Sequence, residues 1–164
     1  MTTADELATF APLSALSPAE LSTLTQAARH VSFLAGQRMI VEGQPAQRCW
    51  LIRHGRVLLD SHVPGRGEVV VQTLGSGDLL GWSWLVPPYQ WHFGAVAAGV
   101  VDTIEFDAAT LAERADADPK FGHTLTLALF EALLERLQAT RARLLDLYRN
   151  PAETCTPYRI DSGR

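Results

Sequence analysis

The sequence predicts a mainly β fold flanked by helices, in which short strands form a sandwich or a barrel. Between residues 31 and 106, short apolar runs are separated by glycine-centred turns, as in all-β domains. Residues 14–29 before this region and residues 119–149 after it have the apolar spacing of helices. We therefore predict one domain over residues 1–150, followed by a flexible polar tail over residues 151–164.

The N-terminal helix is predicted from its start signals. Ser17 is suited to be an N-cap, Pro18 to be the first helical residue, and Glu20 to complete a capping box. Apolar residues then recur at helical spacing from Leu21, and we predict that the helix ends near His30.

The predicted strands are separated by turns in which glycine accepts a positive φ at little cost. The strand-like runs begin at Val31 and end at Phe106. The turn glycines are Gly36, Gly43, Gly55, Gly67 and Gly77.

Two helices are predicted after the strands. Asp107 caps a short helix that continues through Glu113, and Pro119 starts the long helix. Asn150 and Pro151 end it. Along the long helix, one set of residues alternates three and four apart, as in the a and d positions of a coiled coil. This seam consists of Leu127, Phe130, Leu134, Leu137, Arg141, Leu144 and Tyr148.

The seam has two interpretations. It pairs with a second copy or another chain, or it packs against the domain's own sheet, which the additional apolar residues Leu133 and Leu145 would favour. The unbroken register over three heptads favours a homodimer. Arg141 is the charged exception, and it either sets the register or directs its charge toward something bound nearby.

Composition narrows the class of protein. The chain has 164 residues and a formal net charge of −4, which disfavours nucleic acid as a partner. The densest run of basic residues is interpreted as a solvated face of a helix. It consists of Arg136, Arg141, Arg143 and Arg149. The two cysteines, Cys49 and Cys155, are too far apart in sequence to indicate a disulfide framework or a zinc site. Without a signal peptide or a membrane-length apolar stretch, a cytoplasmic location is predicted.

Catalytic patterns are missing from the sequence. There is no phosphate-binding P-loop and no Gly-x-Ser-x-Gly elbow. The five histidines are scattered rather than clustered as metal ligands. We therefore predict a protein that is not an enzyme and has no metal site.

Several turns and strands follow one another in a recognisable order. The pattern includes Gly36, Glu42-Gly43, Trp50-Leu51-Ile52 with Gly55, and Gly77-Asp78 with Leu80-Gly81. In this order and spacing, residues 7–149 resemble the cyclic-nucleotide-binding domain of the CRP/FNR regulator class. The resemblance implies a double-stranded β-helix jelly roll with an N-terminal helix and a long C-terminal dimerisation helix. It also implies a regulatory domain, here expected to stand alone because no helix-turn-helix pattern follows the long helix.

The resemblance further implies a phosphate-binding segment at residues 81–93, which we call the cassette. In the family, a helix N-terminus and an arginine bind the cyclic phosphate, and a glutamate holds the ribose. Here the glutamate position is Trp82, the arginine position is His92 and the following small polar position is Ala95. A mostly neutral histidine is a poor substitute for a bidentate cation. We therefore expect that any effector is not held through the usual cyclic AMP contacts.

The cassette is rich in aromatic residues, which leaves its role open. The rings of Trp82, Trp84, Tyr89, Trp91 and Phe93 either fill the vacated pocket or line a site for a planar ligand. Cyclic nucleotides are candidate ligands, and haem (with His92 as axial ligand) or an aromatic effector is less favoured. The candidate ligand-binding residues are Leu80, Gly81, Trp82, Ser83, Trp84, Trp91, His92, Phe93, Gly94, Ala95 and Arg141.

Three functions remain at this stage. The first is a regulatory module that senses a small effector and signals through a dimer or partner surface. The second is a ligand-free protein-interaction module whose pocket the tryptophans fill. The third, and weakest, is a transcription regulator of the CRP/FNR type.

Overall fold

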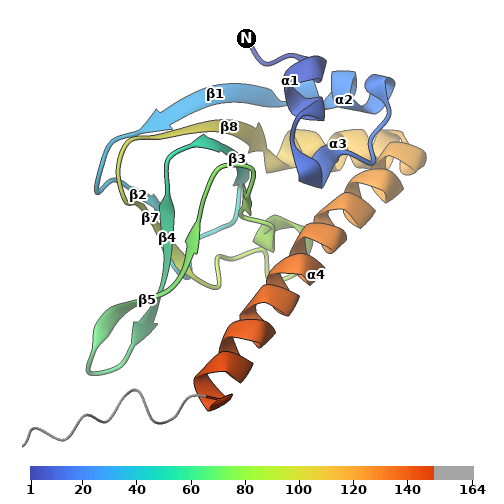
Figure 1. Cartoon of the computed structure of the whole chain (residues 1–164). Helices are drawn as coiled ribbons and strands as arrows, with labels where there is room; N and C mark the ends of the chain where they lie inside the picture. Colours follow the sequence, from blue (N-terminus) through green and yellow to red (C-terminus); the bar gives the residue numbers. More distant parts are fainter. Residues whose placement is uncertain (150–164) are drawn as a thin grey trace, which may run out of the picture.

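The computed structural model describes residues 1–149, in which eight strands form two antiparallel sheets of four strands each (Figure 1). The strand orders are β1-β8-β3-β6 and β2-β7-β4-β5. This arrangement confirms the predicted mainly β jelly-roll fold. The strands are β1 (Ala28–Phe33), β2 (Arg38–Ile40), β3 (Arg48–His54), β4 (Val57–Val63), β5 (Gly67–Leu74), β6 (Leu79–Leu80), β7 (Gly94–Ala97) and β8 (Val101–Asp107).

Helices lie at both ends of the described chain. The N-terminal helices gather above the β1-β8 end of the sheets, and the long helix descends beside the barrel (Figure 1). The residues predicted as a tail, together with the helix stop at Asn150, lie outside the described part. The helical elements are α1 (Ala4–Ala8), η1 (Ala11–Leu13), α2 (Pro18–Thr25), η2 (Ser83–Leu85), α3 (Ala108–Ala117) and α4 (Pro119–Arg149).

The start of α2 is confirmed, and its predicted end is wrong. The Ser17 side chain accepts a hydrogen bond from the Glu20 backbone, and the Glu20 carboxylate accepts one from the Ser17 backbone. The Ser17 backbone N–H and hydroxyl both donate to the Glu20 carboxylate, and these two hydrogen bonds lower the pKa of Glu20. The helix ends at Thr25, and His30 belongs to β1, which pairs with β8 from Ala28 onward. Pairing between strands far apart in sequence overrides the helical periodicity there.

The buried apolar side chains form one continuous core. It begins at Leu7 in α1 and Leu24 in α2, passes through Leu51 and Ile104 in the sheet, and reaches Phe121 in α4. Because these side chains are almost fully buried, the N-terminal helices, the sheets and the start of α4 share one hydrophobic core. Because Phe121 belongs to this core, the core anchors the start of α4 on the domain.

Asp107 and Asp118 set the positions of α3 and α4. Asp107 caps α3 by accepting hydrogen bonds from the backbone and hydroxyl of Thr110, and these bonds lower its pKa. The short helix runs to Ala117, beyond its predicted end at Glu113. The Asp118 side chain accepts a backbone hydrogen bond from Phe121, which starts α4 as predicted.

An ion pair crosses the backbone of β7. One Arg38 guanidinium nitrogen lies 2.7 and 2.6 Å from the two carboxylate oxygens of Asp60, which is buried. A Cβ atom placed at Gly94 would lie 2.1 Å from one of these oxygens. Only glycine therefore fits at position 94 while the pair is present.

Candidate functional site

The cassette connects β6 to β7 across one side of the barrel. It leaves β6 through Gly81, whose φ of +86° is the left-handed conformation that glycine adopts readily. A Cβ atom at Gly81 would lie 2.8 Å from the ring of Trp91. The two ends of the cassette therefore meet, with the Trp91 ring against the Gly81 backbone.

Trp91 is packed into the aromatic interior of the domain. Its side chain is only 6% exposed, and its ring stacks on Trp50 of β3 with 6.0 Å between centroids. The centroid of the Phe93 ring lies 6.4 Å from that of Trp91, and the Phe33 ring meets Trp50 edge-on. Such pairs add to the burial of apolar area. Trp91 therefore occupies interior space between the cassette and β3.

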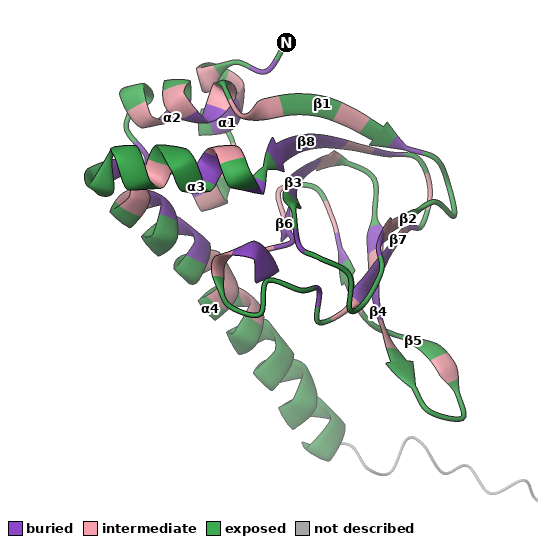
Figure 2. Cartoon of the chain, turned by 180° about the vertical axis from the view of Figure 1, so that it is seen from behind, coloured by how far each residue is buried: buried purple, intermediate pink, exposed green. Residues whose placement is uncertain are grey.

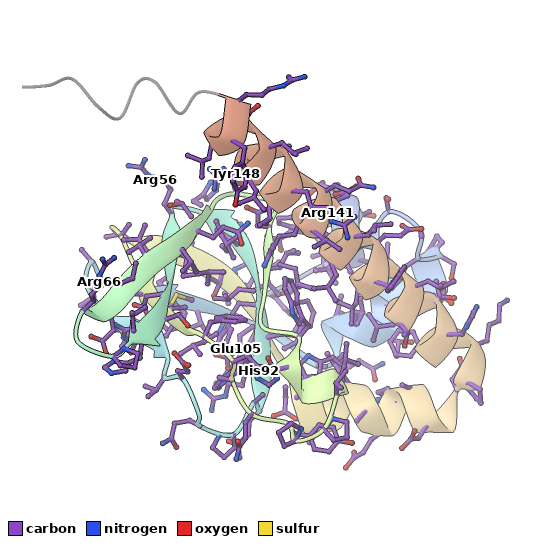
Figure 3. All side chains as sticks on the ribbon, turned by 90° about the horizontal axis from the view of Figure 1, so that it is seen from below. Arg56, Arg66, His92, Glu105, Arg141 and Tyr148 are labelled. Atoms are coloured by element: carbon purple, nitrogen blue, oxygen red, sulfur yellow. The ribbon has the colours of Figure 1, made fainter. Side chains whose placement is uncertain are left out.

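Glu105 of β8 holds this aromatic stack in place. Its carboxylate is 3% exposed and accepts a hydrogen bond of 2.8 Å from the Trp50 indole nitrogen. It is also paired with Arg29, and the Arg48 guanidinium lies 3.6 Å away. A buried carboxylate requires such partners. Glu105, labelled in Figure 3, was not among the predicted site residues, although a glutamate within the apolar run of β8 indicates a buried charge with partners.

Main-chain hydrogen bonds hold the second half of the cassette against the turn at residues 43–46. Gly43 donates to Trp91 and Trp91 donates to Gln44, each at 2.9 Å, and Ala46 donates to Tyr89 at 2.8 Å. Tyr89 has a φ of +56°, an uncommon conformation for a residue with a side chain. The surrounding bonds compensate for this strain, so the position of Trp91 is fixed by the backbone as well as by packing.

Trp82, at the position where the resemblance implies a glutamate, contacts α4. The Arg136 guanidinium lies over its ring, 4.2 Å from the centroid. The Nη2 atom of the same guanidinium donates a 2.7 Å hydrogen bond to the carbonyl of Leu79. Burial lowers the pKa of Arg136 to about 10, a change that nearby Asp78 opposes. Arg136 is thus half-buried at the site, which corrects its prediction as part of a solvated face.

Trp84 and Ser83 are buried in η2. Trp84 lies close to Cys49 of β3, and burial raises the pKa of the Cys49 thiol to about 12. Because the thiolate is the reactive form, Cys49 is an inert core residue.

The other candidate residues divide into two groups. Trp91 lies against Gly81 and Phe93, and Leu80, Gly94 and Ala95 are also buried. His92 and Arg141 are exposed, and they lie well apart, His92 by the cassette and Arg141 on α4 (Figure 3). The roles suggested for His92 and Arg141 stay predictions, and the arginine of α4 that contacts the cassette is Arg136.

Comparison with known families agrees with this architecture. The family described as cyclic nucleotide-binding domain matches residues 30–118, which is more than half of the chain and contains the whole cassette. The chain belongs to the cyclic nucleotide-binding domain family.

This cyclic nucleotide-binding domain is similar to part of a known regulator and to a solved structure. A CRP-like cAMP-activated global transcriptional regulator of Mycobacterium tuberculosis is 25% identical over 130 residues, covering 79% of this chain and 56% of that protein. The chain thus spans about half the length of this relative. A candidate cyclic nucleotide-binding protein of Geobacter metallireducens has 23% identity and a TM-score of 0.76, covering 84% of this chain and 99% of that structure.

A structure with a bound ligand shares the fold of this cyclic nucleotide-binding domain. The regulatory domain of Toxoplasma gondii PKA, crystallised with cAMP, has a TM-score of 0.67 at 17% identity, covering 79% of this chain and 48% of that one. Among the helices of residues 1–149, none is long and apolar enough to cross a membrane. Nor do those residues contain a group of three or more side chains arranged to hold a metal ion.

Proposed function

We propose that this cyclic nucleotide-binding domain is a regulatory module that senses a small effector and transmits the signal through α4 to a second copy of the chain. The contact between Trp82 and Arg136 carries this proposal. It joins the cassette directly to the helix that presents the seam. A ligand that changes the cassette would therefore change the position of α4, provided that it binds the two arrangements with different affinity.

The effector contacts differ from those that the family resemblance implies. The position expected for the ribose-binding glutamate holds an indole that is already engaged with Arg136. The position expected for the phosphate-binding arginine holds His92, whose side chain is exposed. These two substitutions favour an effector that lacks the cyclic phosphate over cyclic AMP.

The seam on α4 is the proposed signalling surface. Its apolar residues are between 41% and 77% exposed, although they follow the coiled-coil spacing. The end of the helix that carries Leu144 and Tyr148 is exposed throughout, since no residue from position 141 to 149 is buried (Figure 2). Pairing with a second seam would bury them: Leu127, Phe130, Leu134, Leu137, Leu144 and Tyr148.

Sedimentation velocity combined with ligand titration tests the proposal. We expect the wild-type chain to sediment as a dimer and Leu134→Glu/Leu137→Glu to sediment as a monomer, because two carboxylates would be buried without partners. Glu131→Gln/Glu135→Gln, on the same part of α4, is the matched control and should remain dimeric. A monomeric wild type, or an unchanged double glutamate variant, would contradict the dimer.

The sensing part is tested by tryptophan fluorescence and thermal unfolding with cyclic AMP, cyclic GMP, ATP and haem. A saturable rise in melting temperature would support sensing, since a ligand at 100 times its dissociation constant adds about 2.7 kcal/mol. A response to cyclic AMP that His92→Ala abolishes would contradict the non-standard contacts proposed here.

The burial of Trp91 favours a second candidate, a ligand-free interaction module. Its ring occupies interior space next to Gly81, as a plug would. If this candidate is correct, no ligand in the titration will stabilise the wild-type chain, while the dimer will persist. Trp91→Ala would then create a cavity and cost about 3–5 kcal/mol of stability, as large core truncations do.

A further inference from the structure

Arg141 is the charged residue of the seam, and it lies on the exposed part of α4 (Figure 3). No ion pair within residues 1–149 includes it. A polar residue at a core position of a coiled coil costs stability, and in return it specifies the register of the two helices. Arg141 therefore constrains how a second copy of the seam can pair with the first.

Parallel pairing would bring two equal charges together. In two parallel helices in register, each core residue faces its own counterpart, so Arg141 would face Arg141 of the second copy. Like charges placed together in an interface are strongly unfavourable. The residues beside Arg141 in such a pair would be Gln138, Thr140 and Leu145, none of which is acidic. A parallel seam therefore leaves the two guanidinium groups without a compensating charge.

Antiparallel pairing brings Arg141 to a negative charge instead. When Leu134 faces Leu137 of the second copy, Arg141 faces Phe130 of that copy, and Glu131 is the next residue. Glu131 is exposed and, like Arg141, has no ion pair within residues 1–149. A guanidinium is attracted both by an aromatic face and by a carboxylate. Because the pair has two-fold symmetry, each copy gives and receives this contact.

The remaining seam residues fit the same register. Leu127 faces Leu144 of the second copy, so every core position from residue 127 to residue 144 faces the other seam, and all except Arg141 are apolar. The apolar residues of this stretch are between 41% and 58% exposed, and pairing would bury them. Leu125 and Leu129, which pack on the domain, belong to another face of α4, so the second helix does not compete with the domain.

We propose that two copies of the chain pair through antiparallel α4 helices, in the register that places Arg141 beside Phe130 and Glu131 of the second copy. The inference deepens the proposed function, on which it rests for the seam as the signalling surface. It specifies the partner, the orientation of the two helices and the contact that fixes their register.

This orientation places the centre of the pair next to the cassette. The two-fold axis crosses α4 between Leu134 and Leu137, and Arg136, which contacts Trp82 of the cassette, lies in the same stretch. A ligand that moves the cassette would therefore act on the middle of the paired helices. Each copy would influence the other through this short stretch of α4.

Cross-linking between single cysteines distinguishes the two orientations. Leu127→Cys and Leu144→Cys chains, each also carrying Cys155→Ser, are treated with a short bismaleimide alone and as a mixture, while Cys49 is buried. In the antiparallel register the two copies of position 144 are about 26 Å apart along the axis, because 17 residues at about 1.5 Å separate positions 127 and 144. We expect a cross-link only in the mixture. A cross-link within Leu144→Cys alone, or none in the mixture, would overturn the proposal.

Spin labels outside the seam give an independent distance. A nitroxide on Arg149→Cys, again with Cys155→Ser, leaves the seam residues unchanged. The antiparallel register separates the two labels by about 40 Å along the axis, whereas parallel helices would hold them within about 20–24 Å, the width of two helices. Pulsed electron resonance should therefore detect the long distance, and a distribution confined to the short range would contradict the antiparallel orientation.

Charge reversal tests the contact between Arg141 and Glu131. Arg141→Glu and Glu131→Arg should each raise the dimer dissociation constant roughly tenfold or more, because like charges then meet. Arg141→Glu/Glu131→Arg should recover most of the affinity, since the ion pair forms again with its charges exchanged. Glu135→Arg makes the same change in net charge at an exposed position outside the contact, and it should dimerise like wild type. A double variant no tighter than Arg141→Glu would overturn the register.

The same samples separate this inference from the proposed function. A dimer whose cross-links and label distances are those of parallel helices would overturn the antiparallel register and leave signalling through the seam intact. A wild-type chain that sediments as a monomer at every concentration would contradict the proposed function itself, and the inference with it.

Discussion

The two halves of α4 both carry apolar residues at helical spacing, but their environments are opposite. In the first half, Phe121, Leu125, Ala128 and Leu129 are buried against the domain. In the second half, the leucines of the seam are exposed, and no residue from position 141 to 149 is buried (Figure 2). Arg136 lies between the two halves and contacts Trp82 of the cassette and the carbonyl of Leu79.

This contrast shows that apolar periodicity identifies the apolar face of a helix but does not identify the surface against which that face packs. The face that continues Leu125 through Leu129, Ala132 and Arg136 at three- and four-residue spacing packs on the same domain. The seam follows a neighbouring face, and its second half leaves the domain with its leucines in solvent. The first half therefore stabilises the fold, and the second half is available for association.

The largest expected effect separates the two halves directly. Leu125 is 4% exposed and Leu144 is 53% exposed, so the same truncation to alanine should have very different costs. Leu125→Ala should reduce the free energy of unfolding by about 2–5 kcal/mol, whereas Leu144→Ala should change it by less than about 0.5 kcal/mol in the monomer. Chemical denaturation in the Leu134→Glu/Leu137→Glu background measures both. Equal costs would mean that the second half also packs on its own domain.

A second comparison exchanges glycine and alanine at one position in each half of α4 and compares the effects on stability. A Cβ atom at Gly122 would lie 2.9 Å from the carbonyl oxygen of Ala115, so Gly122→Ala should push α4 away from α3. We expect a loss of about 1–3 kcal/mol from this overpacking, against the gain of about 1 kcal/mol that alanine gives in an open helix. At exposed Ala142, the reverse change to glycine should cost only about 1 kcal/mol. Stabilisation by Gly122→Ala in thermal unfolding would show that the two helices separate freely.

The smallest expected effect concerns the cap that positions α3 and thus the first half of α4. Asp107→Ala should cost about 1 kcal/mol at pH 7, as the loss of an N-cap does. Because the Thr110 hydrogen bonds lower the Asp107 pKa in the folded state, this contribution is present above the unfolded pKa of about 3.9. It is lost as the pH falls through the lower folded value. Denaturation at pH 7 and pH 2.5 should therefore show a smaller difference between the variant and wild type in acid.

Much of the fold could be predicted from local signals. The Ser17 cap, the glycine-centred turns and the restart at Pro119 all depend on neighbouring residues, and the structure confirms them. The end of α2 could not be predicted in this way. Ala28 continues the helical spacing of the sequence, yet it pairs with Phe106, a residue far along the chain. The short helix α1, capped by Thr3, is only five residues long and gave too little periodicity to predict.

The site was harder to predict because its contacts join distant segments. The sequence identified the cassette and its aromatic residues, and it left open whether they fill the pocket. The stacking of Trp91 on Trp50 and of Arg136 on Trp82 depends on tertiary packing. The spacing of Arg136 from Leu125 and Leu129 on the packed face of α4 was the signal that could have distinguished it from Arg141.

The ion pair across β7 links three positions on three different strands. The carboxylate of Asp60 and the guanidinium of Arg38 occupy the space that any side chain at position 94 would need. A substitution at Gly94 is therefore tolerated only after the pair has been lost, and the pair can be acquired only where position 94 is already glycine. Among descendants of a common ancestor, these three positions should change together, in an order that the geometry imposes.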